Sequence, residues 1–347
     1  MKKKIGLIAV LLVVALLAVW LVLRGNDKMG VPETASGPVR PCYVSQDSAL
    51  FTDGRRVFLE RQVSQLLGQG VDVYEVTGGM DFFAGRSVSM NDAGVADGTL
   101  WIASHTAELG GNVSMAAELG GYSINPPREQ RLSVIRSGAA GQDMYTFYVC
   151  GGRVIEQRVV YGGAGSGNHY ALVDAEGNAA AEAFLKTARR ETLVTDTYIA
   201  HRTEAGAEIF DLGSMQSYAL PATLCGETGA GTMIFPQGVL LSGVLYYLEA
   251  DGVHACDLAA GDDRLLVPQS APEYFCIVGD RLYMAADDGS LTAYDLATGA
   301  GTSTGVAMAK ADRFVIADGQ VYILEIRQLP NNSERASCRI ETLDKAE

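Results

Sequence analysis

Seven short strand-like segments, each with an aromatic residue at its centre, recur along the chain at a regular spacing. They are Val57-Phe58-Leu59, Leu100-Trp101-Ile102, Phe147-Tyr148-Val149, Thr197-Tyr198-Ile199, Leu245-Tyr246-Tyr247, Leu282-Tyr283-Met284 and Val321-Tyr322-Ile323. Their aromatic centres lie 43, 47, 50, 48, 37 and 39 residues apart. A strand-built repeat of about 44 residues cannot cover its own apolar face, so neighbouring units must stack on one another. The period predicts an all-β chain folded as a β-propeller, with seven blades favoured and six or eight also compatible with the spacing.

The stretch GDRLYMAADDGSLTAYDLATG, residues 279–299, shows the punctuation of one unit. Hairpins are predicted at residues 287–290 and 250–252, because Asp-Gly tolerates the positive φ of tight turns. Three units then place Asp-Leu at a similar offset, at Asp211-Leu212, Asp257-Leu258 and Asp295-Leu296. We interpret this ending as an outer strand running into the turn towards the next blade. Helix is predicted over residues 178–190, with Asn178 as its cap, and as a short turn over residues 61–69.

Residues 243–261 and 279–299 resemble the PQQ-like repeats of bacterial extracytoplasmic propellers. The resemblance covers the aromatic-centred strand, the Asp-Gly turn and the Asp-Leu-x-x-Gly ending, over the last third of the chain. That family includes quinoprotein dehydrogenases and non-enzymatic assembly or scaffold lipoproteins. The chain lacks the tryptophan that closes each dehydrogenase repeat, and it has no adjacent cysteine pair. The resemblance therefore implies the propeller fold and the non-enzymatic branch, with no cofactor and no catalytic residue carried over.

The N-terminus is predicted to cross a membrane. Residues 1–4, with three lysines, form a cytoplasmic stub ahead of an uncharged apolar run over residues 5–23. These 19 residues would span about 28 Å as a helix, close to the thickness of bilayer hydrocarbon. A retained anchor is favoured over a cleaved signal peptide, because the run is long and no small-residue cleavage site follows it closely. Since lysines stay inside, we expect a single-pass cell-membrane protein of a bacterium with an extracytoplasmic C-terminal domain.

Residues 24–41, rich in Gly and Pro, form the predicted flexible linker, and residues 42–347 form the predicted propeller domain. The chain carries a net charge of −14, although its first three charged residues are lysines. A domain this acidic is repelled by nucleic acid and by anionic lipid headgroups. The predicted partners are therefore the membrane, through the N-terminal helix, and an envelope protein or small ligand, with nucleic acid excluded.

Six cysteines all lie on the predicted extracytoplasmic side, where disulfides are permitted. Propellers often close their ring by pairing strands from the two ends of the chain. Cys42 starts the first strand-like segment and Cys338 lies in the last one, so we predict a ring-closing disulfide between them. The alternative is that all six thiols stay reduced and buried.

No pattern typical of a catalytic, cofactor or metal site occurs in the sequence. The glycine-rich stretch at residues 161–170 lacks the third glycine of a dinucleotide fingerprint, and the four histidines fall in four different units. No Cys/His cluster has zinc-ligand spacing, and no Gly-x-Ser-x-Gly elbow is present. Carboxylates brought together from separate blades would leave no such pattern, so the catalytic residues stay unknown.

Two segments have the composition of contact loops. Residues 78–85 contain Phe82 and Phe83, and residues 123–131 contain Arg128 and Arg131. Exposed aromatic and arginine side chains are enriched where proteins bind one another. The alternative for Phe82 and Phe83 is that they pack inside a blade.

The sequence therefore favours a non-enzymatic binding or scaffold module for a cell-envelope protein or ligand. A second hypothesis is an extracytoplasmic hydrolase or lyase with its site at the mouth of the propeller channel. A third is a sensor domain, which would need a separate membrane partner because only four residues precede the apolar run.

Overall fold

The structure is a computed structural model, and it describes most of the chain beyond residue 47. The described residues are 48–65, 68–77, 82–87, 90–108, 114–124, 130–137, 143–163, 165–188, 191–229, 231–328 and 334–343. All of them belong to the larger of two compact units, residues 35–347.

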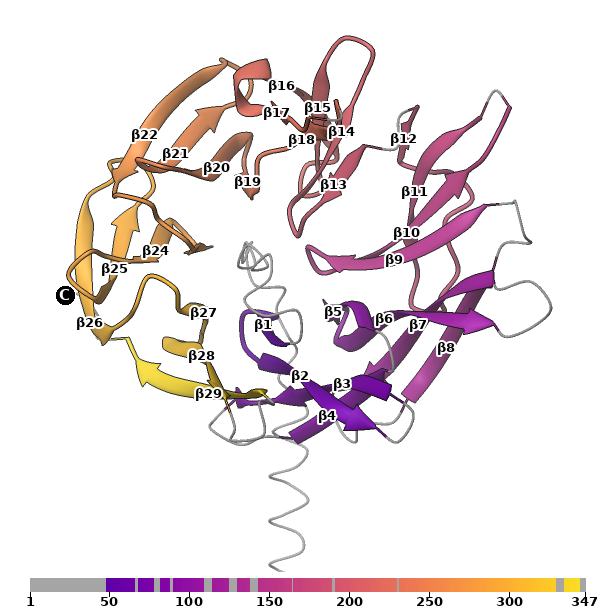
Figure 1. The fold of residues 1–347 in the computed structure, drawn as a ribbon, viewed down its shortest axis with the longest axis horizontal. Coiled ribbons are helices and arrows are strands. Elements are labelled where there is room, and N and C mark those ends of the chain that lie inside the picture. The colour runs from indigo at the N-terminus through magenta and orange to yellow at the C-terminus, as the bar shows by residue number, and fades with distance from the viewer. Residues whose placement is uncertain are drawn as a thin grey trace, which may run out of the picture. The chain divides into compact units, whose positions relative to one another are not determined.

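Within the described residues, six four-stranded sheets and one three-stranded sheet form the seven blades of a propeller (Figure 1). Blades 1 to 3 contain β1 (Ser48–Thr52), β2 (Val57–Gln65), β3 (Gly68–Glu75) and β4 (Phe82–Ser87); β5 (Met90–Ala96), β6 (Thr99–Glu108), β7 (Ser114–Ser123) and β8 (Gln130–Ser137); and β9 (Met144–Cys150), β10 (Arg153–Val160), β11 (Gly167–Val173) and β12 (Leu185–Thr187). Blades 4 and 5 contain β13 (Thr192–Val194), β14 (Tyr198–Arg202), β15 (Ala207–Asp211) and β16 (Gln216–Leu220); and β19 (Gly238–Leu241), β20 (Val244–Glu249), β21 (Gly252–Asp257) and β22 (Asp262–Pro268). Blades 6 and 7 contain β23 (Phe275–Val278), β24 (Arg281–Ala285), β25 (Ser290–Asp295) and β26 (Gly301–Ala307); and β27 (Arg313–Ala317), β28 (Gln320–Gln328) and β29 (Glu334–Thr342). The 3-10 helix η2 (Ala222–Leu224) and the hairpin of β17 (Gly226–Glu227) and β18 (Met233–Ile234) lie between blades 4 and 5.

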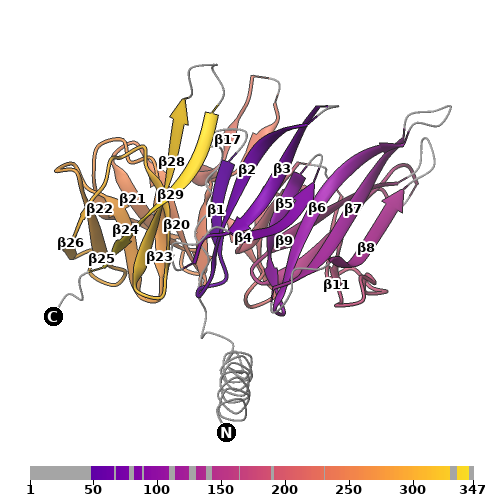
Figure 2. The ribbon, with the colours of Figure 1, turned by 90° about the horizontal axis from the view of Figure 1, so that it is seen from below.

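The antiparallel order of the strands divides the turns between two faces of the ring. Within each four-stranded blade the strands pair in the order of the chain. Turns between the first and second and between the third and fourth strands therefore lie on one face. Turns between the second and third strands and the links between blades lie on the other, which we call the connection face. The β17–β18 hairpin lies on the connection face and stands above the blades (Figure 2).

Seven hydrophobic clusters of the described residues lie between neighbouring blades. Each cluster joins one blade to the next, as Trp101 of blade 2 and Val154 of blade 3 do. The ring closes in the same way, because Leu59 of blade 1 packs in one cluster with Tyr322 and Leu324 of blade 7. The remaining five clusters join blades 1 and 2, 3 and 4, 4 and 5, 5 and 6, and 6 and 7. The prediction of a seven-bladed propeller is confirmed.

The aromatic centres of six of the seven triplets lie in the second strand of their blade, and that of blade 3 does not. Tyr148 lies in β9, the first strand, whereas the second strand β10 carries the fully buried Ile155. The triplets therefore do not all mark the same strand of their blades. An aliphatic side chain fills the core position there as well as an aromatic one does.

The Asp-Leu endings lie inside their blades, which corrects our interpretation of them. Asp211, Asp257 and Asp295 each end a third strand, and the turn that follows leads to the fourth strand of the same blade. Each aspartate accepts hydrogen bonds from the turn; Asp295 Oδ1, for example, accepts those of the Ala297 and Thr298 backbone N–H groups at 3.1 and 2.8 Å. The motif is thus a capped turn at the outer edge of a blade.

The predicted Asp-Gly hairpins are confirmed. Residues 250–251 join β20 to β21, which begins at Gly252, and residues 286–289 join β24 to β25. Gly289 has a φ of 80°, and the backbone N–H of Ser290 donates to Asp288 Oδ1 at 3.0 Å.

Neither predicted helix forms. Residues 61–65 and 68–69 belong to the β2–β3 hairpin, and residues 178–188 form a loop and the strand β12. Asn178 closes a turn with Asp174 instead of capping a helix, since its backbone N–H donates to Asp174 Oδ1 at 2.8 Å. Leu185 is buried between blades 3 and 4, so completing the sheet outweighs the helix propensity of the alanines.

In the part of the chain that the structure describes, no helix is both long and apolar enough to cross a membrane. The predicted span at residues 5–23 lies outside the described residues.

Candidate functional site

A pocket of about 310 Å³ opens on blade 5, beside the link from blade 4. Its wall combines a turn of the connection face, three strands of blade 5 and the 3-10 helix η2. The lining residues are Thr223, Leu224, Tyr247, Glu249, Ala250, Asp251, His254 and Asp263. Tyr247 belongs to the hydrophobic cluster between blades 4 and 5, so the pocket lies on the side of blade 5 that is turned towards blade 4.

The imidazole of His254 lies between two carboxylates. Nε2 is 2.9 Å from Asp251 Oδ1, and Nδ1 is 3.2 Å from Asp263 Oδ2. Asp251 lies in the β20–β21 turn, three residues before His254, and Asp263 lies on the neighbouring strand β22. Tyr247 is the cross-strand partner of His254, and their ring centroids are 5.5 Å apart.

This arrangement favours the doubly protonated imidazolium. A carboxylate only accepts hydrogen bonds, so both ring nitrogens must carry a proton to satisfy Asp251 and Asp263 together. Burial by itself would lower the pKa of His254, but the hydrogen bonds and charges of the two aspartates outweigh it and raise that pKa above 6.5. The hydrogen bond to His254 in turn lowers the pKa of the exposed Asp251. Burial and a hydrogen bond to Asp263 raise the pKa of the Tyr247 hydroxyl.

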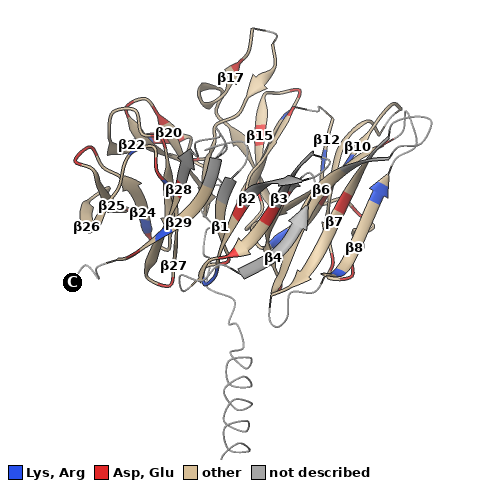
Figure 3. Ribbon diagram, turned by 60° about the horizontal axis from the view of Figure 1, so that its bottom comes forward, with Lys and Arg blue, Asp and Glu red and all other residues tan. Residues whose placement is uncertain are grey.

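The pocket is acidic even with His254 protonated. Glu249, Asp251 and Asp263 contribute three carboxylates against one imidazolium, and Asp251 keeps 65% of its side chain exposed. Figure 3 shows Asp and Glu residues in the turns beside β20 and β22. Such a pocket attracts a cationic group, and the ring of Tyr247 adds an aromatic wall.

The pocket is poorly suited to acid–base catalysis or metal binding. A general base needs a free lone pair, and both nitrogens of His254 are engaged by carboxylates. Those carboxylates lie at opposite ends of the ring and do not converge on one point. Among the described residues, no three His, Cys, Asp or Glu side chains are placed to hold a metal ion together.

The β17–β18 hairpin projects from the connection face (Figures 2 and 3). It begins two residues after Leu224, which lines the pocket. Its base is held to blade 4, because the Tyr198 hydroxyl donates to the Pro236 carbonyl at 2.5 Å. Its tip is also held, since Arg202 Nη1 donates to the Gly231 carbonyl at 3.1 Å. Phe235 is buried, whereas Ile234 on β18 is 52% exposed. The hairpin is therefore an anchored projection that offers an aliphatic side chain to solvent.

The structure distributes the predicted contact residues over separate elements. Phe82 and Phe83 begin β4, the outermost strand of blade 1, opposite Glu75 and Tyr74. Arg131 is exposed on β8 of blade 2, and Arg128 lies outside the described residues. None of the described ones lines the pocket on blade 5.

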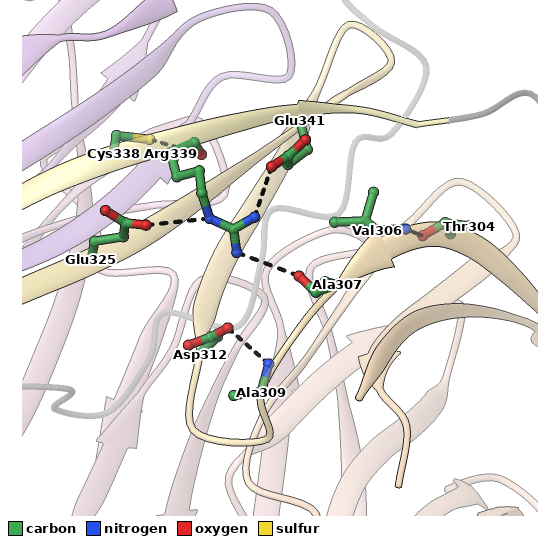
Figure 4. Close-up of polar contacts among 9 residues, drawn as sticks. All are labelled: Thr304, Val306, Ala307, Ala309, Asp312, Glu325, Cys338, Arg339 and Glu341. Atoms are coloured by element: carbon green, nitrogen blue, oxygen red, sulfur yellow. Dashed lines mark hydrogen bonds and ion pairs between the residues drawn. The ribbon is translucent and has the colours of Figure 1, made fainter. Parts of the chain in front are cut away.

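Of the two cysteines predicted to close the ring, Cys42 lies outside the described residues. Cys338 lies on β29 and packs against the cluster between blades 7 and 1. Its neighbour Arg339 lies between Glu325 and Glu341, at 3.3 and 2.8 Å, and donates to the Ala307 carbonyl of blade 6 at 3.4 Å (Figure 4). The β29 strand is thus tied to both neighbouring blades.

The pocket residues were not identified from the sequence. Asp263, which completes the pocket, lies on β22. The sequence signal was the cluster of Glu249, Asp251 and His254 around one hairpin turn. Only the pairing of β21 with β22 brings Asp263 to the same ring.

No protein-family model matches the chain, and no curated protein matches it. Among solved structures, BamB from Moraxella catarrhalis is 12% identical over 87% of this chain and 87% of its own, with a TM-score of 0.34. The AfRom2 CNH domain is 10% identical over 90% and 96%, with a TM-score of 0.40. The Pyrococcus horikoshii acylaminoacyl peptidase is 10% identical over 85% of this chain and 50% of its own, with a TM-score of 0.45. These similarities are too low to carry an argument about function, which must come from the site itself.

Proposed function

We propose that this chain is a membrane-anchored, extracytoplasmic β-propeller that binds a cell-envelope protein through its connection face. In this proposal residues 5–23 are the anchor, the preceding residues are cytoplasmic, and the propeller, with its PQQ-like repeats, acts as a non-enzymatic scaffold. The anchor and the location are supported by the lysines and the apolar run at the N-terminus.

The observation that carries the proposal is the pairing of an anchored, projecting hairpin with an acidic pocket on one face. Ile234 is an exposed apolar contact, and the pocket beside it accepts a cation. An apolar anchor flanked by charges of one sign is typical of surfaces that recognise another protein. We infer that the partner presents an apolar side chain next to a lysine or arginine.

Binding fits this site better than catalysis does. The His254 imidazolium has no free nitrogen to take up a proton. Burial raises the pKa of both thiols near the pocket, that of Cys225, which follows the lining residue Leu224, and that of the fully buried Cys256. The hydrolase or lyase hypothesis would require a different site at the channel mouth.

The test is a crosslinking pull-down from intact cells with a C-terminal tag and a membrane-impermeant reagent. Ile234→Asp and the double variant Asp251→Asn/Asp263→Asn should each reduce recovery of a stoichiometric partner at least tenfold. Ile135→Asp is the matched control, because Ile135 is 56% exposed on β8 of blade 2, across the ring from blade 5 (Figure 1).

Equal losses in all three variants, or no loss in the first two, would contradict the proposed surface. Failure of the reagent to label the domain at all would contradict the extracytoplasmic location. Recovery of no protein partner would move the search to small ligands and the channel mouth.

A further inference from the structure

His201 on β14 has an environment unlike that of any other described histidine. Its side chain is buried, with 4% of the residue exposed. Among the described residues, the buried polar side-chain atoms that lack a hydrogen-bond partner are the two ring nitrogens of His201, Nδ1 and Nε2. The nearest carboxylate oxygen, Glu208 Oε2, is 3.8 Å from Nε2, which is too far for a hydrogen bond. A buried polar group left in this state destabilises the fold, so its presence calls for an explanation.

His201 belongs to the interface between blades 3 and 4, which we call the 3/4 seam. Side chains alternate along a strand, so His201 lies on the same face of β14 as Ile199, which packs against blade 3. Its cross-strand partners are Thr192 and Glu208.

The 3/4 seam contains a buried polar layer beside its hydrophobic cluster. The Tyr170 hydroxyl of blade 3 donates to Thr192 Oγ1 of blade 4 at 3.0 Å and accepts a hydrogen bond from Gln157 at 3.1 Å. Asn168 and Thr187 are hydrogen-bonded to each other at 3.2 Å in the same part of blade 3. Thr192, the blade 4 member of this layer, is the cross-strand neighbour of His201. Every member except His201 has its hydrogen bond.

Protonation of His201 is unfavourable while the seam is closed. Two ring N–H groups and a positive charge would then be buried without an acceptor in good hydrogen-bond geometry. Burial lowers the pKa of His201 below 6.5, and the charge of Glu208 and the nearby Arg202 backbone oppose this only in part. The titratable groups of the seam near His201 are Glu208 on β15 and the phenols of Tyr170 on β11 and Tyr148 on β9. Arg202, next along β14, lies on the other face of the strand and is paired with Glu191. The residues of β10 and β12 on this side, Ile155, Gln157, Leu185 and Thr187, do not titrate.

We propose that His201 makes the 3/4 seam an acid-sensitive joint, which loosens when the imidazole becomes protonated and releases the β17–β18 hairpin. The hairpin is involved because Arg202, the next residue, binds both Glu191 and the Gly231 carbonyl at 3.1 Å. Proton uptake favours whichever state exposes the ring to water, so the loosening begins as the pH falls below the ordinary histidine value. The inference rests on the proposed function, because the hairpin that His201 would control belongs to the proposed binding surface. Its test uses the isolated chain and needs no binding partner.

Native thiols report on three seams separately. Cys150 lies in the cluster of the 3/4 seam, Cys256 in that between blades 4 and 5, and Cys276 in that between blades 6 and 7. The experiment is a timed reaction of the full chain with 4,4′-dithiodipyridine at pH 7.5 and 5.5, each site being normalised to its rate in unfolded protein at the same pH. We expect the Cys150 rate to rise up to roughly tenfold on acidification. Tenfold is the limit because His201 in the opened state would titrate with the ordinary histidine pKa and take up one proton between the two pH values. Cys256 and Cys276 should change much less.

His201→Gln removes the titration while keeping a polar group, and His201→Leu removes both. Whichever variant shows a native thermal transition at pH 7.5 should lose the acid response at Cys150, whereas the control His169→Gln should keep it. His169 suits this purpose because it lies on β11 with its ring bonded locally to the Gly165 carbonyl. An equal rise at all three thiols, no rise at Cys150, or a response that survives in the His201 variants would overturn the inference. A normal acid response with no partner in the pull-down would reject the proposed function alone.

Discussion

His254 and His201 lie on neighbouring blades, and the groups around each ring have opposite effects. Two aspartates accept hydrogen bonds from His254, whereas neither ring nitrogen of His201 has a partner in good hydrogen-bond geometry. The pKa of His254 is therefore raised above 6.5, and the pKa of His201 is lowered below it. The sequence neighbours of a histidine do not decide this, because Glu208 is seven residues from His201 and yet too distant to bond it.

The first prediction concerns the protonation of His254. In Asp263→Asn the pKa of His254 should fall towards the ordinary value, because one charged acceptor is lost. Carbon-detected NMR titration of labelled histidine measures this directly. Because the pKa of His254 is raised in the folded protein, the stability it contributes is fully present below the pKa of the unfolded chain and is lost as the pH rises through the pKa of the folded protein. The pKa of Asp251 is lowered, so its contribution is lost as the pH falls through the Asp251 pKa of the folded protein. A His254 titration that is the same in wild type and Asp263→Asn would contradict the hydrogen-bonded geometry.

The second prediction compares two glycines at the same place in neighbouring blades. Gly261 and Gly299 have φ angles of 74° and 71°, which any other residue adopts only with strain. A Cβ on Gly261 meets nothing within 4 Å, whereas one on Gly299 would lie 2.3 Å from the Leu266 carbonyl oxygen of blade 5. Gly261→Ala should lower the free energy of unfolding by about 1 kcal/mol, and Gly299→Ala by roughly 1–3 kcal/mol more. Urea unfolding of both variants measures the difference, and equal losses would show that the blade 5–blade 6 contact is absent.

At the scale of the element, the Asp-Leu turn recurs with the same hydrogen bonds in blades 4, 5 and 6. After each aspartate, the leucine N–H donates to the turn between the first two strands, as Leu258 does to the Gly243 carbonyl at 3.0 Å. The leucine side chain is buried against a neighbouring blade. The motif therefore closes the outer edge of a blade and fixes one side chain in the cluster with the preceding blade.

The third prediction tests this turn. Asp211 is 4% exposed, and its carboxylate accepts hydrogen bonds from the Gly213 N–H and the Ser214 hydroxyl, both at 2.7 Å. Asp211→Ala should cost about 1–3 kcal/mol of unfolding free energy, because two hydrogen bonds to a buried carboxylate are lost. Asp257→Ala is the matched control and should cost less, since Asp257 is exposed and water can replace its carboxylate. Chemical denaturation of the two variants distinguishes them, and an equal cost would mean that burial does not matter here.

Element type could be predicted wherever the local pattern and the sheet require the same conformation. The Asp-Gly hairpins satisfy this condition, and both formed as expected. Residues 178–188 do not, because a helix-favouring sequence lies where blade 3 needs a fourth strand. The backbone N–H groups of Ala180 and Phe184 donate to Leu172 and Tyr170 of β11, so the sheet captures the segment.

At the scale of the whole molecule, the ring closes through packing between blades 7 and 1. Leu59 and Tyr322 are both almost fully buried in that cluster, although 263 positions separate them in the sequence. Blade 7 has three strands among the described residues, and β29 carries Cys338.

The fourth prediction is the disulfide between Cys42 and Cys338. It would close a loop of about 300 residues and could stabilise the fold by roughly 5 kcal/mol through its effect on the unfolded chain. We expect faster migration of the unreduced chain on a denaturing gel and a drop in thermal stability in Cys338→Ala. Cys276→Ala is the control for loss of a thiol. Free reaction of Cys42 with a thiol reagent in the folded protein would contradict the pairing.

The repeat of aromatic-centred strands and Asp-Gly turns was enough to predict the all-β class and the propeller and to favour seven blades, and the sheets of the structure then fixed that number. Those properties depend on contacts between residues close in sequence, repeated along the chain. The pocket around His254, the unpaired ring of His201 and the ring-closing cluster depend instead on which strands and blades become neighbours. Such contacts are set by strand register and by packing across blades, and therefore only the tertiary structure decided them.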